Sequence, residues 1–407
     1  MWPTLISRQG LTPKDAPSFE NFPTNVTRSQ SPRVFGLDLL RAIAILGVLF
    51  AHYFVVLYDH VPALGVLGHG GFYGVELFFV LSGFLIGGIL MRSGSEFGRT
   101  TKLGVFYVRR WFRTLPLFWL FLVINVLLEF FLADRHLTLS EILGHGFFVR
   151  GFNAFHFSFF LESWSLAIEE WFYLLFPAAL WLGLRIWKHF DPVFLTTAAA
   201  FFLFSTIARM LSASNPNATW GEWQRMIVIY RFDGLMIGVF AVWISLRYPY
   251  YWRAGAWLSA LAGVVLLIAM YATLWKVVDH RLAFGDDSYF ARTFRFTFVS
   301  LGFALLLPIA SLWQLNRETV LSSGIRRIAL WSYALYLVHI PVFQVVTRYL
   351  FTGWKASPLQ GFASFGFQVA VSVGISALLY RFFESRFTHL RDRVAPRVAR
   401  LLERARI

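Results

Sequence analysis

Cysteine is absent from this 407-residue sequence, and its absence excludes several kinds of protein. Without thiols there is no disulfide framework, no thiolate zinc site, no cysteine-ligated iron–sulfur cluster and no cysteine nucleophile. Charge is also scarce, because Asp, Glu, Lys and Arg together make up only 14% of the residues. An average soluble domain carries about 25%. The chain therefore lacks the charged surface that a soluble protein of this size needs.

Apolar residues are correspondingly abundant. Hydrophobic residues make up 57% of the chain and aromatic residues 19%, which is more than a soluble protein of this length can bury. The formal net charge is +15. In a soluble protein such an excess suggests nucleic acid, whereas in a membrane protein the positions of the basic residues indicate topology. We expect a lipid bilayer, and no nucleic acid, among the partners.

Ten stretches are long and apolar enough to cross a bilayer, some only approximately. A spanning helix needs about 20 mostly apolar residues to cross a hydrocarbon layer of roughly 30 Å. The sequence predicts an all-α, polytopic membrane protein with about ten transmembrane helices around a polar central cavity. A shorter apolar stretch at 142–149 is predicted to form a re-entrant or interfacial helix. The ten predicted spans lie near 37–58, 70–91, 114–133, 160–184, 193–213, 227–246, 256–276, 293–313, 328–350 and 360–380.

The basic residues predict the orientation of the chain. If the N-terminus is cytoplasmic, most Lys and Arg residues outside the spans fall on the cytoplasmic side. The excess of positive charge on that side predicts that both termini are cytoplasmic. We expect a cytoplasmic tail at 1–35, a membrane domain at 36–386 and a basic cytoplasmic tail at 387–407. The polar N-terminal segment has no apolar signal-peptide core, so we expect no cleaved secretory signal.

Ionisable residues inside predicted spans point to a polar interior, because a charge in the bilayer core costs at least a few kcal/mol. The first span carries Arg41 and His52. Eleven helical residues separate their side chains by about 20° around the axis and about 16 Å along it, so both can line one channel. Arg41 reaching the headgroups and His52 packing in the core is the alternative. Glu76, in the second span, must pair with a cation or bind a proton.

The fourth span begins with a polar pattern. Ser165 and Glu169 are four residues apart and share a face, while Glu170 is turned away by about 100°. A hydroxyl and a carboxylate in this position suit hydrogen bonding to a sugar or orienting a catalytic imidazole. The alternative is an ordinary helix start, where acidic residues favour the helix dipole. This accounts for Glu162 better than for Glu169.

Two further spans contain polar pairs. Arg231 and Asp233 are two residues apart, so they lie on different faces and each needs its own partner. A structural ion-pair network is the favoured interpretation of these two. Tyr336 and His339 share one side of the ninth span, just before Pro341, and are predicted to support the site from behind.

Three arginines, Arg109, Arg110 and Arg113, come just before the third span on the cytoplasmic side. Their charge is consistent with ordinary positive-inside topology. A cluster of guanidinium groups beside aromatic residues is also what a nucleotide with several phosphates requires. Composition does not separate these two interpretations.

Taken together, these segments resemble the acyltransferase-3 family of integral membrane O-acyltransferases. The resemblance covers about residues 34–387 and departs from the family only near the end, where Glu384-Ser385-Arg386 replaces the usual Glu-x-Pro. No hydrolase-like domain is attached, so we expect the stand-alone form of the family. The matching motifs, in family order, are Arg41-x10-His52, Phe78-Phe79-x-x-Ser82-Gly83, Arg110-x-x-Arg113, Trp164-Ser165-Leu166-x-x-Glu169-Glu170, Arg231-Phe232-Asp233 and Tyr333-x-x-Tyr336-Leu337-x-His339.

The resemblance implies transfer of an acyl group, most commonly acetyl from acetyl-CoA, to a hydroxyl of an extracytoplasmic carbohydrate or glycolipid, in the bacterial cytoplasmic membrane. Its implied co-substrate is acyl-CoA, and no metal is implied. The catalytic residues would be His52 as general base, Glu169 as the group that orients it, Ser165 and Arg41. Acyl-CoA would bind to Arg109, Arg110 and Arg113 in some combination. Substrate-binding or supporting residues would be Glu76, Trp164, Arg231, Asp233, Tyr336 and His339.

Some questions stay open at this point. Transient acylation of His52 is an alternative to direct transfer. A transporter or exporter of a glycan or small metabolite is the main competing function, since buried Arg, His and Glu also build transport pathways. Against it, the chain shows no repeated halves. The outer loops that we expect to select the acceptor contain Trp220, Trp223, Asp286 and Asp287.

Overall fold

The computed structural model describes residues 34–57, 68, 70–152, 159–215, 224–273, 275–278, 281–284, 288–315, 317–351 and 357–405. These residues belong to one unit that begins at Val34. The predicted N-terminal tail lies almost entirely outside them. So do the four loop residues proposed to contact the acceptor, Trp220, Trp223, Asp286 and Asp287.

Eight helical segments of the described chain are long and apolar enough to cross a membrane, which confirms an integral, multi-pass membrane protein. Each of the ten predicted stretches coincides with a helix. The two shortest, α8 (Phe232–Arg247) and α10 (Ala256–Ala272), have 16 and 17 residues and are not among the eight, so the count of ten is not confirmed. The other eight helices are α1 (Phe35–Tyr53), α3 (Phe72–Ser93), α4 (Thr100–Leu132), α6 (Ser163–Ile186), α7 (Phe190–Ala213), α12 (Arg295–Leu312), α13 (Val320–Tyr349) and α14 (Pro358–Leu379).

Shorter elements connect these helices. The predicted interfacial helix is α5 (Leu139–Gly146), which starts at a capping box formed by Thr138 and Glu141. Two other short helices are α9 (Pro249–Ala254) and α11 (Tyr289–Thr293). The remaining turns are 3₁₀ segments at Phe54–Leu57, Gly94–Gly98, Val149–Phe152 and Val228–Tyr230, and a π-helical segment at Tyr380–Glu384.

One hairpin departs from the all-α prediction. Strands β1 (Trp275–Val278) and β2 (Arg281–Phe284) pair antiparallel, with Trp275 opposite Phe284. Their sequences, Trp-Lys-Val-Val and Arg-Leu-Ala-Phe, contain β-branched and aromatic residues that favour strands. The apolar run that predicted a helix as far as residue 276 therefore ends earlier, at Ala272.

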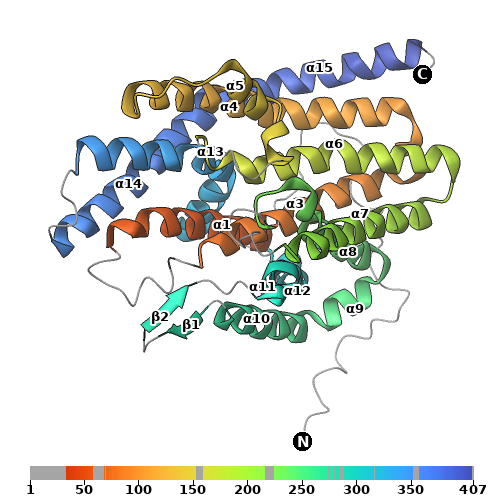
Figure 1. Ribbon diagram of the computed structural model, residues 1–407. Helices are drawn as coiled ribbons and strands as arrows, with labels where there is room; N and C mark the ends of the chain where they lie inside the picture. Colours follow the sequence, from red (N-terminus) through yellow and green to blue (C-terminus); the bar gives the residue numbers. More distant parts are fainter. Residues whose placement is uncertain are drawn as a thin grey trace, which may run out of the picture. The chain divides into compact units, whose positions relative to one another are not determined.

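Helix α4 is longer than predicted and has a helical partner. It begins at Thr100 instead of near 114, so the three arginines lie inside a helix and not in a connection. The expected C-terminal tail contains a helix, α15 (Ser385–Arg404), which packs along the first half of α4 (Figure 1). Average hydropathy did not predict the first part of α4 or helix α15, because each of these segments has a polar face. Contact at Gly104 is close, since an added Cβ would lie 2.6 Å from a Leu402 methyl carbon.

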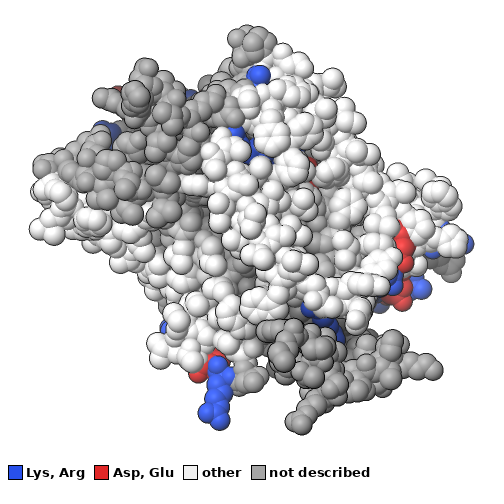
Figure 2. Space-filling model, turned by 90° about the horizontal axis from the view of Figure 1, so that it is seen from below, with Lys and Arg blue, Asp and Glu red and all other residues white. Residues whose placement is uncertain are grey.

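Close helix packing builds the frame of the site. Helix α3 packs against α1 on one side and α8 on the other. At the α3–α8 contact a Cβ on Gly83 would lie 1.8 Å from the Leu235 carbonyl oxygen, and one on Gly238 would lie 2.1 Å from that of Val80. Small residues of this kind let membrane helices approach closely. Figure 2 shows a face on which most of the described side chains are uncharged, as expected for a surface in contact with lipid.

Candidate active site

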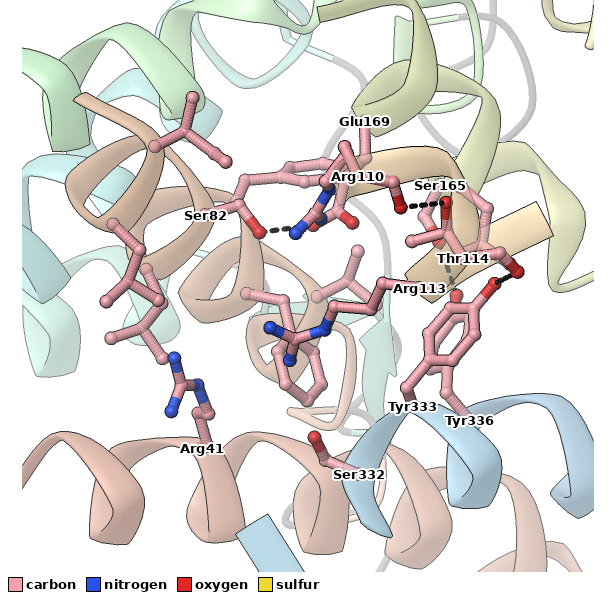
Figure 3. A pocket seen from close by; sticks show the side chains of 17 residues that line it. Arg41, Ser82, Arg110, Arg113, Thr114, Ser165, Glu169, Ser332, Tyr333 and Tyr336 are labelled. Atoms are coloured by element: carbon pink, nitrogen blue, oxygen red, sulfur yellow. Dashed lines mark hydrogen bonds between the residues drawn. The ribbon is translucent and has the colours of Figure 1, made fainter. Parts of the chain in front are cut away.

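A cavity of about 190 Å³ lies between α1, α3, α4, α6 and α13 (Figure 3). Its apolar lining comes mainly from α3. Its polar lining comes from all five helices, so residues far apart in the sequence meet here. The polar residues are Arg41, Ser82, Arg110, Arg113, Thr114, Ser165, Glu169, Ser332, Tyr333 and Tyr336.

Three arginines share this cavity. Arg41 reaches it from α1, and Arg110 and Arg113 reach it from α4 (Figure 3). Arg41 is 3.1 Å from an oxygen of Asp38, one turn earlier in its own helix. The Arg110 guanidinium lies 3.6 Å from the centre of the Tyr173 ring, which fixes its orientation. Arg113 makes no hydrogen bond or ion pair with the described residues, so its charge is available to a ligand.

Arg109 is separated from this pair. It is exposed and does not line the cavity. The α4 residues that line the cavity, Arg113, Arg110 and Thr114, span an arc of about 100° around the helix, and Arg109 lies about 40° outside this arc, beyond Arg113. Of the three arginines proposed to bind a nucleotide, the structure thus brings two into the cavity, together with Arg41.

Hydroxyl groups organise the carboxylate side of the cavity. Ser82 of α3 donates a hydrogen bond of 2.6 Å to Glu169, which ties α3 to α6. The hydroxyls of Ser165 and Tyr336 are also 2.6 Å apart, which ties α6 to α13. Ser165 and Glu169 both face the cavity, as their spacing predicts.

His52 lies at the C-terminal end of α1, outside the cavity lining. Its Nδ1 is 2.9 Å from the carbonyl oxygen of Val48. A carbonyl can only accept, so we assign the proton to Nδ1, and the Nε2 lone pair is left free to act as a base. The imidazole ring is 4.8 Å from that of His339, measured between ring centres.

His339 links His52 to the cavity. Its ring centre is 5.4 Å from that of Tyr336, which lines the cavity. Its Nδ1 donates to the main-chain oxygen of Tyr336 at 2.6 Å, while its buried Nε2 has no partner among the described residues. Tyr336 therefore shares the cavity with the arginines and contacts His339, which contacts His52.

The expected contact between Glu169 and His52 is not formed within the described residues. Glu169 is hydrogen-bonded to Ser82, and the Nδ1 atom that a carboxylate would orient is already bound to Val48. His389 of α15 makes the same contact with the main-chain oxygen of Ser385, four residues earlier, at 2.7 Å. The imidazole tautomer is therefore set by the backbone of α1 and not by Glu169.

Comparison with known proteins decides the family. A family model described as an acyltransferase domain matches residues 34–381, which is most of the chain. The chain belongs to the acyltransferase-3 family. Nothing among the solved structures matches it.

Two curated relatives of this acyltransferase-3 chain are named O-acetyltransferases. OatA of Staphylococcus aureus is 28% identical over 357 residues, covering 79% of this chain and 53% of the relative. Peptidoglycan O-acetyltransferase OatA of Listeria monocytogenes is 24% identical over 410 residues, covering 88% of this chain and 56% of the relative. The chain thus spans about half the length of these relatives.

Two buried ion pairs lie outside the cavity lining of this acyltransferase-3 domain. Arg231 donates to both oxygens of Glu76, at 2.7 and 2.6 Å, and joins the start of α8 to α3. Asp233 pairs with Arg209 of α7 at 2.8 Å and accepts a hydrogen bond of 2.6 Å from Thr297 of α12. All four charged side chains are fully buried and none lines the cavity.

Some residues near the site were not predicted. Arg209 had a usable signal, because it is an arginine within a predicted span. Arg225 had none, because it lies in a connection between predicted spans. Its guanidinium is 4.9 Å from the Trp164 ring centre and 5.3 Å from that of Phe72, and it interacts electrostatically with His52. Trp164 itself is buried and packs edge-on against Phe79.

Proposed function

We propose that this protein is a membrane O-acyltransferase that transfers an acetyl group from cytoplasmic acyl-CoA to a hydroxyl of an extracytoplasmic carbohydrate or glycolipid. We place it in the cytoplasmic membrane of a bacterium. Family membership and the names of the two relatives support acyl transfer. The observation that carries the proposal is that three arginines share a cavity with Tyr336, whose ring contacts His339, which in turn contacts His52.

The arginine cluster suits the donor. Three guanidinium groups around one small cavity repel each other, and an anion placed between them removes that repulsion. A nucleotide with a diphosphate and a 3′-phosphate supplies such charge, and guanidinium groups bind phosphate oxygens with two parallel hydrogen bonds. We assign Arg110 and Arg113 to the phosphates of CoA, with Arg41 beside the diphosphate. Arg109 is left out because it does not face the cavity.

The histidine pair suits the transfer itself. Arg41 and His52 are about 16 Å apart along α1, a distance that the flexible pantetheine arm can bridge. The free Nε2 of His52 removes the proton of the acceptor hydroxyl while the hydroxyl oxygen attacks the thioester carbonyl. The C–S bond breaks, and the imidazolium returns its proton to the departing thiolate. Direct transfer is favoured here, although acylation of the same Nε2 would use the same geometry.

Glu169 then has a different role from the one first expected. Its carboxylate lies in the cavity with Arg110 and Arg113 and is held by Ser82. We propose that it balances the charge of the arginines and keeps their guanidinium groups in place when no donor is bound. His339, packed against His52, would limit the rotation of the catalytic imidazole.

Reconstituted protein tests the function. Purified protein in nanodiscs is mixed with labelled acetyl-CoA and a soluble peptidoglycan fragment, and both acetylated product and free CoA are measured. We expect acceptor-dependent release of CoA, which His52→Ala reduces at least a hundredfold while the protein stays folded. Movement of a glycan across liposomes without any release of CoA would instead support the exporter.

A further inference from the structure

Glu162 is a buried acid that the proposed mechanism does not use. It occupies the N-cap of α6, where a carboxylate normally accepts a hydrogen bond from the first free N–H groups of the helix. The Glu162 side chain makes no such bond. The residue is only 4% exposed, and neither carboxyl oxygen has a hydrogen-bond partner among the described residues. Neither the start of α6 nor any other described part of the chain therefore provides a hydrogen bond to this carboxyl group.

The surroundings of Glu162 are those of the site. Its main-chain oxygen accepts hydrogen bonds from Tyr336, at 3.3 Å, and from Ser165, at 3.4 Å, and both of these residues line the cavity. Its carboxyl group interacts electrostatically with Tyr336 and with Tyr53, the neighbour of His52 in the chain. The Tyr53 hydroxyl in turn donates to the main-chain oxygen of His339 at 3.0 Å. Glu162 thus belongs to the end of the site where the histidines lie.

A buried carboxyl without a partner is destabilising, and native proteins rarely keep one without a reason. The buried Nε2 of His339 is a second acceptor for which the described residues provide no partner. Two unsatisfied acceptors call for a ligand with at least two hydrogen-bond donors. A polyhydroxylated molecule meets this requirement, whereas a simple apolar alcohol does not.

We propose that Glu162 binds the acyl acceptor, its carboxyl group accepting a hydrogen bond from one hydroxyl of a polyhydroxylated molecule while another hydroxyl is presented to His52. The assignment rests on the proposed transferase function and adds an acceptor contact to it. His339 provides the second contact through Nε2. Glu162 is thus a substrate-binding residue and takes no part in proton transfer.

Steady-state kinetics of two Glu162 variants test the assignment, with acetyl-CoA as donor and the soluble peptidoglycan fragment as acceptor. Glu162→Leu removes both hydrogen-bonding atoms of the side chain, so we expect the KM for the acceptor to rise about tenfold, the effect of one lost hydrogen bond. Both kcat and the KM for acetyl-CoA should change less than about twofold. Glu162→Gln keeps an acceptor oxygen and should restore the acceptor KM to within about threefold of the original. Glu403→Leu makes the same replacement on exposed α15 and serves as the matched control.

Each other outcome has a definite meaning. An unchanged acceptor KM in a folded, active Glu162→Leu protein would overturn the assignment and leave Glu162 as a buried acid with no role in binding. A loss of kcat with an unchanged acceptor KM would overturn it too, in favour of a role in the chemical step. If the unsubstituted protein transfers no acetyl group, the proposed function fails. Titrating the peptidoglycan fragment against the Trp fluorescence of the unsubstituted and Glu162→Leu proteins then tests acceptor binding alone.

Discussion

Arg110 and Arg113 line the cavity, while Arg109, next to them in the chain, does not. This difference predicts how single substitutions affect the donor. Arg110→Ala and Arg113→Ala should each raise the KM for acetyl-CoA about tenfold or more, because each removes a charge-assisted contact with phosphate. Arg109→Ala is the matched control and should stay within about twofold. Equal effects of all three substitutions would mean that the arginines act only through their general positive charge.

Glu169, which lines the cavity with the arginines, shows what residue spacing can and cannot predict. The i,i+4 spacing correctly placed Ser165 and Glu169 on one face, because helix geometry is local. It could not show that Ser82 of another helix would bind Glu169, or that the Val48 carbonyl would take the Nδ1 proton of His52. Those contacts depend on how the helices pack against each other, and the spacing of residues along one helix does not determine that packing.

The contribution of individual helix contacts to the free energy of unfolding can be tested, first at the contact between α3 and α8. The Arg231–Glu76 pair is fully buried there, about two helical turns along α3 from the close contact of Gly83 with Leu235. Glu76→Gln leaves the Arg231 charge buried with a weaker partner, and should lower the free energy of unfolding by about 3 kcal/mol or more. Thermal unfolding in detergent measures this loss. An unchanged melting temperature would show that water or lipid headgroups compensate the charge.

Helix α5 carries a pH-dependent contact. His145 is buried, and its Nδ1 is 3.1 Å from the hydroxyl of Ser163 at the start of α6. Burial, with a smaller contribution from the charge of Arg150, lowers the pKa of His145 to about 4. In the unfolded chain the pKa is about 6.5. Between these two values the unfolded chain binds a proton that the folded protein excludes.

The free energy of unfolding should therefore fall as the pH drops from about 6.5 toward 4, by at most about 1.4 kcal/mol per pH unit, and this contribution is constant above that window. Melting temperatures at pH 7.5, 6 and 5 test the slope. His145→Asn keeps an N–H group near Ser163 but does not titrate, so its melting temperature should fall less over the same range. Parallel curves for the two proteins would assign the pH dependence to other groups.

At the scale of the whole molecule, the sequence predicted the long apolar helices well, because each long apolar run forms one helix. The predicted helix boundaries were wrong where a helix has a polar face, as in residues 100–113 of α4 and in α15. Average hydropathy does not distinguish the polar face of such a helix from its apolar face. The hairpin at Trp275–Phe284 was missed because short apolar runs suit strand and helix alike. The residues of the candidate site were proposed from motifs, whereas their division between a cavity and a histidine pair could be seen only in the packed helices.

The number of spans can be decided by the side on which α9 lies. With the N-terminus in the cytoplasm, as we propose, α9 is cytoplasmic if α8 and α10 both cross the membrane. If neither crosses, α9 faces outside, and the remaining spans keep the same orientation. The absence of cysteine from the chain makes a direct test available, because a single introduced cysteine is the only thiol to react. Tyr250 on α9 is 75% exposed and accepts such a change.

We expect ten spans, so Tyr250→Cys should resist a membrane-impermeant maleimide in intact cells and react once the cells are permeabilised. Ser140→Cys on α5 provides the outside reference and should react in intact cells, while Glu403→Cys on α15 provides the inside reference. Reaction of Tyr250→Cys in intact cells would place α9 outside and reduce the count to eight. The side of the membrane proposed for the arginine cavity and the C-terminal helix is the same in either case, because adding or removing both α8 and α10 leaves the orientation of the other spans unchanged.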